Sequence, residues 1–329
     1  MTRVGLVGSG TMAGVYADRL AGLDAEVVAV ASPNTAGAFV AEHAPGATAY
    51  ADAAAMYDAE PLDAVGVCSP THLHREHVEA AVERGLDVVC EKPLARTMAG
   101  ADAIVEAVEG SDVTFMTAHV VRFFPEYATA RERVEAGDVG TPGVVRAKRS
   151  VAYGGDPGWF ADEEKSGGVL LDVAIHDLDY LRWVVGPVER VFARLTRWGG
   201  GDHKSALATL RFASGAVGHV EADWLRMPDQ PFETRFEIAG DGGLIEFDAR
   251  DATGYEAWTR EGHRAPTDPF DLVLAEDGYH RQLRQFLDCR EGGGEPTVGA
   301  EAGRASVRVA LAAIESAESG APVAVDAVE

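Results

Sequence analysis

The chain has 329 residues, of which 47% are hydrophobic and 25% charged, and this length is enough for two domains with separate cores. Its formal charge of −24 at pH 7 excludes nucleic acid and anionic membrane surfaces as partners, because both bind basic patches. No apolar run is long enough to span a membrane and no secretory signal precedes the first strand, so we expect a cytoplasmic protein.

The acidic composition and the cysteines carry further information. The 53 acidic residues outnumber the 29 basic ones, which are almost all arginine. This composition fits a high-salt cytoplasm, where an acidic surface keeps proteins soluble, or a GC-rich genome that favours arginine codons. Cys68, Cys90 and Cys289 are scattered and form no Cys-x-x-Cys pair, so we expect neither a disulfide framework nor a structural metal site.

The first predicted strand, residues 3–7, leads directly into a dinucleotide-binding pattern. The sequence Gly8-Ser9-Gly10-Thr11-Met12-Ala13 fits G-x-G-x-x-G/A, in which the first glycine makes the turn and the second admits the pyrophosphate. The small third residue lets the next helix, expected over residues 11–23, pack on the strand and offer its N-terminal amides to phosphates. The expected cofactor-binding residues here are Gly8, Gly10, Thr11, Met12 and Ala13.

The second predicted strand, residues 26–31, bears on the choice between NAD and NADP. An NAD site usually ends this strand with Asp or Glu, which binds the ribose 2′-hydroxyl. Here Ser32-Pro33-Asn34-Thr35 follows, and we expect Ser32 and Asn34 to contact the cofactor. No carboxylate would repel a 2′-phosphate, but the usual arginine partner is also absent. The pattern favours NADP and leaves NAD open.

Strands and helices then alternate, which predicts a parallel, doubly wound sheet. The expected segments are a helix at 39–43, strands at 47–50 and 62–68, a helix at 73–84, a strand from residue 86, a helix at 98–109 and a strand at 113–118. The strand at 62–68 is followed by Ser69, Pro70, Thr71 and His74, which we expect to line the nicotinamide ribose. The alternative is that Thr71 caps a helix and the histidine is solvated. His72, His74 and His77 lack metal-site spacing.

A charged pair ends the strand that begins at residue 86. Glu91-Lys92-Pro93 stands at its carboxyl end, where open α/β sheets bind their ligands. Lys92 is one of only four lysines in the chain. We expect Lys92 to face cofactor and substrate, with Glu91 as its support.

The pattern changes after residue 118. An amphipathic helix is expected at 125–135, followed by alternating strands at 144–151, 188–198, 205–212, 217–224, 232–239 and 244–247 and a last helix at 301–317. Short turns between consecutive strands indicate antiparallel hairpins. The expected fold is therefore α/β, with a Rossmann domain at residues 1–120 and a second α/β domain at 121–329. The second domain has a large, mostly antiparallel open sheet, and the last helix can pack back on the first domain.

One predicted helix in the second half is almost wholly apolar. It runs over residues 168–181 and should be buried against the sheet. Asp172 and His176 are four residues apart and would share one face, with Asp179 or Tyr180 continuing the row. The alternative is a solvated edge of an amphipathic helix, but the apolar flanks and the cost of burying unpaired polar groups favour an active site.

These motifs together resemble the Gfo/Idh/MocA family of oxidoreductases, the group of glucose-fructose oxidoreductase and inositol dehydrogenase. The resemblance covers essentially the whole chain. Its most specific marks are Glu91-Lys92-Pro93 and the Asp172-to-His176 spacing after Gly167-Gly168. The supporting marks are Gly8, Gly10, Ala13, the segment 70–74 and Arg122-Phe123.

The resemblance implies NAD(P)-dependent oxidation of a hydroxyl group, with Lys92, Asp172 and His176 as the catalytic set and no metal. It implies a cis Lys92–Pro93 peptide, a cofactor contact from Arg122, and a position near the cofactor for Trp159. It also implies a homodimer or homotetramer formed through the open sheet. Thr71 stands where many relatives have Asn.

The residue types agree with this chemistry. Histidine, with an ordinary pKa of ~6.5, suits proton transfer near neutral pH, and a desolvated lysine stabilises a developing alkoxide. Asp172 would orient the substrate or the imidazole. Two other classes stay open, namely an NAD(P)-binding regulator without turnover and a glycosidase that oxidises its substrate transiently.

The substrate stays open among inositols, aldoses, sugar nucleotides and related hydroxyl compounds. The residues expected to shape its pocket are Tyr153, Trp159, Asp179, Tyr180 and His280.

Overall fold

The computed structural model describes residues 1–152, 159, 162–198, 203–226, 230, 232–250, 255–259, 262–264 and 277–329. The chain forms two compact units. Unit 1 comprises Met1–Val120 and Asp277–Ala305, and unit 2 comprises Val121–Glu276 and Ser306–Glu329. The expected single division after residue 120 thus differs from the structure, in which the segment 277–305 belongs to the first unit.

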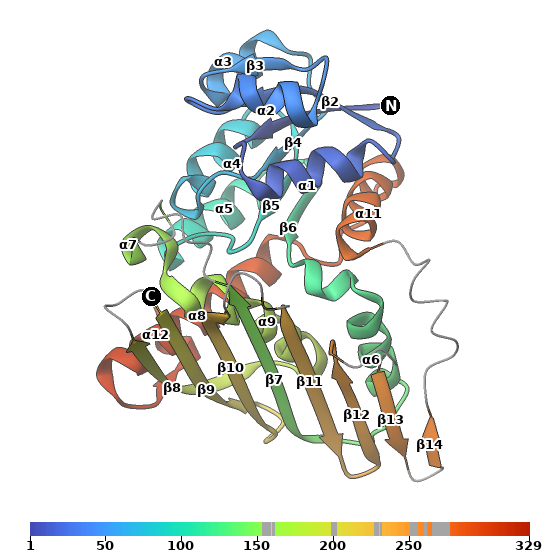
Figure 1. The fold of residues 1–329 in the computed structure, drawn as a ribbon, viewed down its shortest axis with the longest axis vertical. Coiled ribbons are helices and arrows are strands. Elements are labelled where there is room, and N and C mark those ends of the chain that lie inside the picture. The colour runs from blue at the N-terminus through green and yellow to red at the C-terminus, as the bar shows by residue number, and fades with distance from the viewer. Residues whose placement is uncertain are drawn as a thin grey trace. The chain divides into compact units, whose positions relative to one another are not determined.

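Unit 1 is built on a six-stranded parallel sheet with the order β3-β2-β1-β4-β5-β6 (Figure 1). Its strands are β1 (Thr2–Val7), β2 (Ala25–Ala31), β3 (Thr48–Tyr50), β4 (Ala64–Val67), β5 (Asp87–Glu91) and β6 (Phe115–Ala118). This is the predicted doubly wound sheet, and its order reverses between β1 and β4, which is where such sheets bind ligands.

Helices cover both faces of this sheet. They are α1 (Thr11–Leu20), α2 (Ala36–His43), α3 (Ala53–Ala59), α4 (His74–Val82), α5 (Met98–Glu109) and α11 (Gly278–Gly292), with the 3-10 turn η1 (Thr71–Leu73). Helix α1 neighbours α2 and α11, whereas α4 neighbours α3 and α5. The sequence predicted neither α3 nor α11.

Helix α11 explains why the chain returns to unit 1. Asp277 caps it by accepting a hydrogen bond from the amide of His280 at 2.8 Å, and the same carboxylate pairs with Arg19 of α1 at 2.6 Å. The buried Leu283, Phe286 and Leu287 recur at helical spacing and complete an apolar face. Packing of this face beside α1 places residues 277–305 with the first unit.

Unit 2 is built on a nine-stranded sheet with the order β14-β13-β12-β11-β7-β10-β9-β8-β15. All neighbouring pairs are antiparallel except β7 and β10, so the predicted mostly antiparallel sheet is confirmed. The strands are β7 (Pro142–Ala152), β8 (Val188–Trp198), β9 (His203–Phe212), β10 (Val217–Arg226), β11 (Glu233–Gly240), β12 (Gly243–Asp248), β13 (Tyr255–Thr259), β14 (Gly262–Arg264) and β15 (Val323–Ala324).

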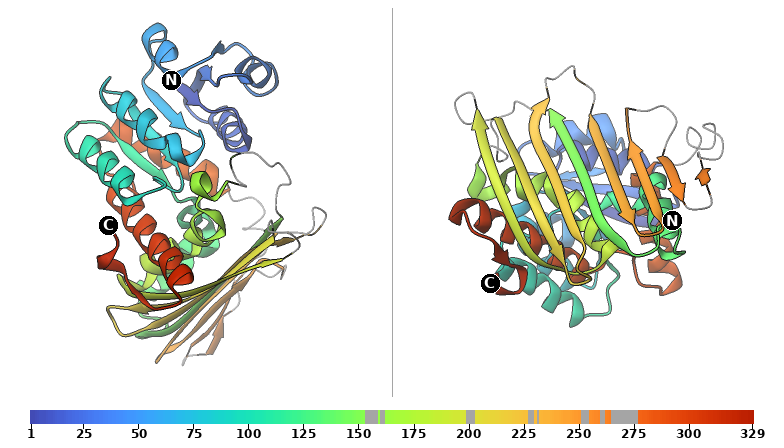
Figure 2. Two further views of the ribbon diagram at one scale, coloured as in Figure 1. Left: turned by 90° about the vertical axis from the view of Figure 1, so that its left-hand side faces the viewer. Right: turned by 90° about the horizontal axis from the view of Figure 1, so that it is seen from below.

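One face of this sheet carries the helices of unit 2. They are α6 (Pro125–Glu135), α7 (Glu163–Ser166), α8 (Gly168–Asp172), α9 (Ala174–Val185) and the greater part of α12 (Ala300–Ser319), with the turns η2 (Val120–Phe123) and η3 (Val325–Ala327). Within the described part of the chain, no helix lies on the opposite face (Figure 2). None of the described helices is long and apolar enough to cross a membrane.

Candidate active site

The turn after β1 has the geometry that the glycine pattern requires. Gly8 has φ +108°, and a Cβ there would lie 2.5 Å from the backbone oxygen of Cys68, so only glycine fits. Gly10, which precedes α1, has open space where a Cβ would project. Ala13 is completely buried and packs α1 on the sheet. Thr11 is exposed and Met12 half-buried at the start of the helix.

Three hydroxyl groups meet beside this turn. The Oγ atom of Ser9 lies 2.9 Å from that of Ser32 and 2.5 Å from Oγ1 of Thr35. Ser32 and Thr35 are themselves 2.9 Å apart. Asn34 is exposed on the same loop. The end of β2 therefore presents a cluster of neutral donors at the position where an NAD site usually has a carboxylate.

The loop after β4 places two of its predicted residues below the surface. Ser69 is 8% exposed, and its Oγ has no hydrogen-bond partner among the described residues. Thr71, in η1, is 3% exposed, and Pro70 is half-buried. An unsatisfied buried hydroxyl at the carboxyl edge of a parallel sheet is a position where a ligand could supply the missing partner.

His74 does not have the position expected of a cofactor contact. Its side chain is 1% exposed, and its Nδ1 and Nε2 atoms each lie 2.9 Å from a backbone carbonyl oxygen, of Pro93 and Ser69 respectively. Burial lowers the pKa of His74 to about 4, so the ring is neutral at pH 7. The ring contacts backbone on both sides and does not line the surface of the predicted site.

Lys92 stands at the carboxyl end of β5, as predicted, and is half-buried. The Lys92–Pro93 peptide is cis, which the family resemblance implied. The Lys92 amide donates to Oε2 of Glu91 at 3.2 Å. Glu91 is 6% exposed and hydrogen-bonds to Tyr16 of α1, whose pKa is raised by burial and by this carboxylate. Glu91 therefore supports the backbone at Lys92 from inside unit 1.

The apolar segment of unit 2 is not one continuous helix. It is divided at Val173 into α8 and α9, because Val173 has φ −97° and the His176 amide reaches back only to Val173, at 3.4 Å. The predicted burial is nevertheless correct. Residues 168–181 are all buried except Asp172 and His176, which are half-buried. These are the two polar residues that the sequence selected as catalytic.

Asp179 and Tyr180 do not continue that row. Asp179 is completely buried and accepts hydrogen bonds from Nε and Nη2 of Arg122 at 2.7 and 2.6 Å and from the Ser306 hydroxyl at 2.6 Å. Tyr180 is completely buried and packs edge-on against Tyr127, with ring centroids 4.7 Å apart. Both residues belong to the core of unit 2, as do the adjacent buried residues Asp177, Leu178 and Leu181.

Arg122 and Arg149 anchor α9 through ion pairs with its aspartates. The sequence did not predict these two pairs. Arg149 of β7 donates from Nε and Nη2 to the fully buried Asp177 at 3.0 and 2.9 Å. Arg122, 5% exposed, lies over the indole ring of Trp183 at 5.1 Å in addition to its pair with Asp179. The guanidinium of Arg122, which we expected to contact the cofactor, is therefore already paired with the buried carboxylate of Asp179. Alternation along β7 could have revealed Arg149, since it stands at an inward position.

Three further predictions concern single residues. Trp159 is half-buried, and Tyr153 lies outside the described residues. His280 lies 3.6 Å from where a Cβ of Gly22 would project, just beyond the C-terminal end of α1. This is the edge of the parallel sheet opposite the glycine turn, so His280 does not fit the expected pocket.

The described residues fit a dinucleotide and not a metal ion. Among them, no group of three or more His, Cys, Asp or Glu side chains is arranged to hold a metal ion. A dinucleotide fits better, since Gly10 leaves open space, α1 has no side-chain cap at its first turn, and the Ser69 hydroxyl has no partner. The described residues of unit 1 therefore fit a dinucleotide better than a metal ion.

Comparison with known proteins agrees with this geometry. Residues 2–119 match the oxidoreductase family with an NAD-binding Rossmann fold, and residues 127–246 match the GFO/IDH/MocA C-terminal domain. The chain is 30% identical to myo-inositol 2-dehydrogenase of Thermotoga maritima over 96% of both chains. It is 31% identical to D-xylose 1-dehydrogenase (NADP⁺) 2 of Haloferax volcanii over 92% of both chains.

Solved structures extend the likeness to the whole fold. Levoglucosan dehydrogenase in complex with NADH and levoglucosan superposes with a TM-score of 0.88 at 25% identity, over 98% of each chain. A probable dehydrogenase from Thermotoga maritima superposes with a TM-score of 0.84 at 29% identity, over 99% of this chain and 100% of that one.

A Rossmann unit with a cofactor turn, followed by a second unit with an open sheet, defines a two-domain NAD(P)-dependent oxidoreductase. The chain belongs to the Gfo/Idh/MocA family.

Proposed function

We propose that the chain transfers a hydride between NAD(P) and the carbon of a hydroxyl group in a sugar or polyol, with Lys92, Asp172 and His176 acting on one substrate. One observation carries the proposal most directly. In the fully described segment 168–181, Asp172 and His176 are the two residues that are not buried. The named activities of the inositol and xylose dehydrogenases support the substrate class.

Each of the three residues has a distinct role in this proposal. The nicotinamide, when bound, accepts or supplies the hydride. Lys92 donates a hydrogen bond to the substrate oxygen and stabilises its developing negative charge. His176 takes the hydroxyl proton during oxidation and returns it during reduction. Asp172 orients the substrate or the imidazole.

A panel of inositols, aldoses and other polyols, assayed with NAD and with NADP, tests this proposal. We expect reduction of free cofactor by at least one member. The Lys92→Met and His176→Ala variants should lose about 10²–10⁴-fold in kcat while still binding cofactor. Lys165→Met is the matched control, because Lys165 is half exposed and pairs with Asp162 on the surface. Near-normal turnover in both site variants would refute the assignment.

The same panel separates the alternatives. A regulator would bind cofactor and reduce none of it. A glycosidase would retain its cofactor through purification and form product without net reduction.

A preference for NADP over NAD is the second part of the proposal. Its support is the cluster of hydroxyls of Ser9, Ser32 and Thr35, which can donate to a 2′-phosphate and carries no negative charge. We expect a lower KM for NADP in the wild type. Ser32→Asp should shift the preference toward NAD, because its carboxylate repels the phosphate and accepts from a 2′-hydroxyl. A wild-type preference for NAD would refute this part.

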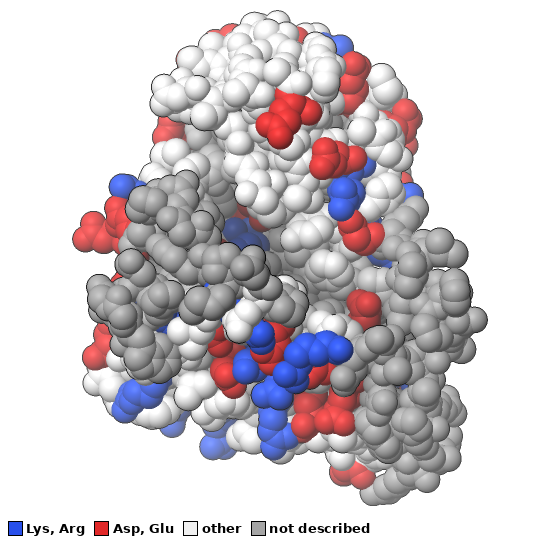
Figure 3. Space-filling model, in the orientation of Figure 1, with Lys and Arg blue, Asp and Glu red and all other residues white. Residues whose placement is uncertain are grey.

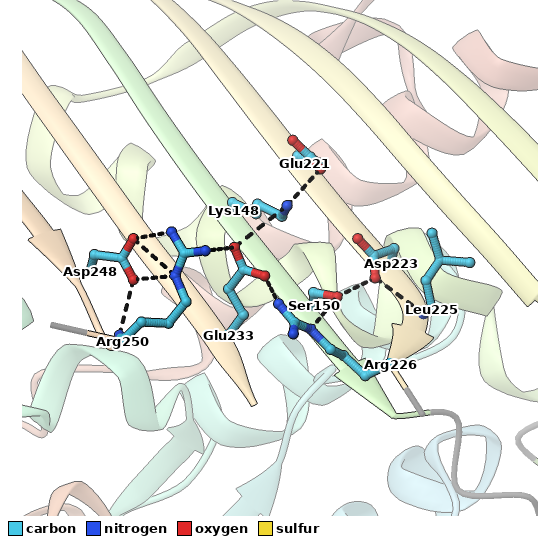
Figure 4. A network of polar contacts seen from close by, with 9 residues as sticks. All are labelled: Lys148, Ser150, Glu221, Asp223, Leu225, Arg226, Glu233, Asp248 and Arg250. Atoms are coloured by element: carbon cyan, nitrogen blue, oxygen red, sulfur yellow. Dashed lines mark hydrogen bonds and ion pairs between the residues drawn. The ribbon is translucent and has the colours of Figure 1, made fainter. Parts of the chain in front are cut away.

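We further propose that copies of the chain associate through the open face of the nine-stranded sheet. Arg149 points to α9, so Lys148 and Ser150 point to the opposite face. Figure 4 shows the network there: Lys148 pairs with Glu221 at 3.1 Å and with Glu233 at 3.5 Å, and Arg226 also pairs with Glu233. Acidic and basic side chains are interspersed over these strands (Figure 3), so self-repulsion is lower there than the net charge of −24 suggests.

Light scattering tests this association. We expect a dimer or tetramer for the wild type and dissociation for Lys148→Glu, which adds an uncompensated negative charge to the network. A wild-type monomer at all salt concentrations would contradict it.

A reducing, salt-rich cytoplasm is the location we propose. Cys68, Cys90 and Cys289 are free thiols, which supports a reducing compartment. The net charge of −24 should make molar salt stabilising, because counterions screen acidic self-repulsion. A free energy of unfolding that is highest without added salt would count against salt adaptation.

A further inference from the structure

His74 joins the two loops that carry the predicted site residues of unit 1. The loop after β4 holds Ser69, and the loop after β5 holds Lys92 and Pro93. These strands are neighbours, with Val67 paired to Cys90. The imidazole of His74 lies between the loops, with Nε2 2.9 Å from the Ser69 carbonyl oxygen and Nδ1 2.9 Å from that of Pro93.

The position of the ring excludes direct contact with substrate or cofactor. His74 is 1% exposed, and both nitrogens face carbonyl groups of the chain itself. A neutral ring has one N–H, which it donates to one of these oxygens. Replacing the ring by a hydrocarbon would leave the carbonyl oxygen that accepts this N–H without its donor and would favour movement of that loop toward water.

The backbone at Lys92 is thus fixed from two directions. On one side its amide donates to Glu91 at 3.2 Å, and Glu91 is hydrogen-bonded to Tyr16. On the other side the carbonyl of the next residue, Pro93, contacts His74. Lys92 itself is half-buried, and these two supports fix the backbone from which its side chain starts.

We infer that His74 is a positioning residue that sets the direction of Lys92 toward the reacting oxygen by tying the loop after β5 to the loop after β4. This inference rests on the proposed function of Lys92. A purely structural histidine would affect stability alone. A positioning histidine also affects the chemical step in the molecules that remain folded.

Three variants test the inference. His74→Leu fills the space without a donor, and His74→Gln retains an N–H for one carbonyl. His77→Gln is the matched control, since His77 is on the same helix but half-buried. The measurements are kcat per folded enzyme, the cofactor dissociation constant, and the primary deuterium isotope effect with labelled substrate.

We expect His74→Leu to lose about 100-fold in kcat, the size of effect that a displacement of roughly 1 Å produces. Its isotope effect should rise because hydride transfer becomes more rate-limiting, while cofactor affinity changes far less. His74→Gln should recover part of the loss, and His77→Gln should match the wild type. A wild-type kcat and isotope effect in folded His74→Leu would overturn the inference, as would a loss confined to stability. If His74→Leu does not fold, His74→Gln decides by the same measures.

A second measurement does not depend on turnover. Limited acylation of the native protein, quantified by mass spectrometry, compares Lys92 with the three other lysines, Lys148, Lys165 and Lys204. His74→Leu should change the labelling of Lys92 relative to the others and weaken its protection by NADP. If the wild type oxidises nothing on the panel, the proposed function fails. The labelling of Lys92 then still decides whether His74 positions Lys92. Unchanged labelling of Lys92 in His74→Leu would overturn the inference.

Discussion

The two units hold their predicted catalytic residues by different means. In unit 1 the segment at Lys92 is fixed by hydrogen bonds to backbone groups and by one buried carboxylate. In unit 2 the helix that carries His176 is fixed by two buried ion pairs, Arg149–Asp177 and Arg122–Asp179. The contacts at Lys92 come from groups of unit 1 that are close in sequence, whereas the contacts to α9 come from arginine side chains of η2 and β7. We therefore expect the two units to respond differently to mutation and to pH.

The largest effect on stability should come from breaking a buried ion pair. Arg149→Met leaves Asp177, which is completely buried, without its guanidinium partner and should cost about 3–5 kcal/mol in the free energy of unfolding. Urea unfolding measures this. The double variant Arg149→Met/Asp177→Leu should recover most of the loss, because it removes the buried charge. Equal losses in the single and double variants would show that packing, and not charge, dominates.

The second ion pair should tolerate the same change better. Arg122→Met leaves Asp179 with the Ser306 hydroxyl at 2.6 Å and with Arg182 at 3.7 Å. Its loss in the free energy of unfolding should therefore be smaller than that of Arg149→Met. If Arg122→Met lost more free energy of unfolding than Arg149→Met, the contact of Arg122 with Trp183 would contribute more to stability than its pair with Asp179.

Unit 1 should be sensitive to acid through His74. Burial lowers the pKa of His74 from 6.5 to about 4, so the unfolded chain takes up a proton at a higher pH than the folded chain. Stability from this residue is complete above pH 6.5 and falls as the pH drops toward 4, by about 3 kcal/mol in all. The difference between wild type and His74→Gln, measured by urea unfolding across this range, isolates the contribution. If the difference in the free energy of unfolding did not change with pH, the predicted role of His74 in acid sensitivity would be wrong.

A helix cap near Lys92 should contribute less. Thr97 accepts a hydrogen bond from the Gly100 amide at 3.1 Å and so caps α5, the helix that follows the Lys92 loop. Thr97→Ala should cost about 1 kcal/mol in the free energy of unfolding. Thr97→Ser, which keeps the hydroxyl, should retain most of the stability.

The smallest effect should come from a surface ion pair. Arg75 and Glu79 are one turn apart on α4, with Nε and Oε1 2.8 Å apart and an arginine side chain that is 55% exposed. Arg75→Ala should change the free energy of unfolding by less than about 0.5 kcal/mol. A loss comparable to that of Arg149→Met would remove the distinction between buried and exposed pairs.

The sequence predicted the parts of the fold that depend on short-range patterns. Gly8 sits in a turn that only glycine fits, and α5 and α6 have the bounds expected from their periodicity. The division at Val173 was not predictable, because apolar periodicity continues across it. Helix α11 was missed because its apolar residues are few and separated by charged ones.

The site was only partly predictable for a related reason. Asp172 and His176 differ from their neighbours in being half-buried, as expected of residues in a site. Asp177, Asp179 and His74 have the same residue types but are occupied by partners distant in sequence or by backbone carbonyls. Spacing alone cannot separate these cases, since it does not show how deeply the rest of the fold buries each side chain.

The return of residues 277–305 to unit 1 has a consequence for how the protein is made. Thr117 of β6 donates its amide to Val298 at 2.8 Å, and a Cβ at Gly303 would lie 2.5 Å from the Thr117 hydroxyl, so the late segment fits closely against the early strand. A ribosome exposes the first 120 residues long before this segment emerges. The first unit therefore remains incomplete during most of translation, although N-terminal domains ordinarily fold first. A fragment ending before Asp277 would lack part of its first unit as well as of its second.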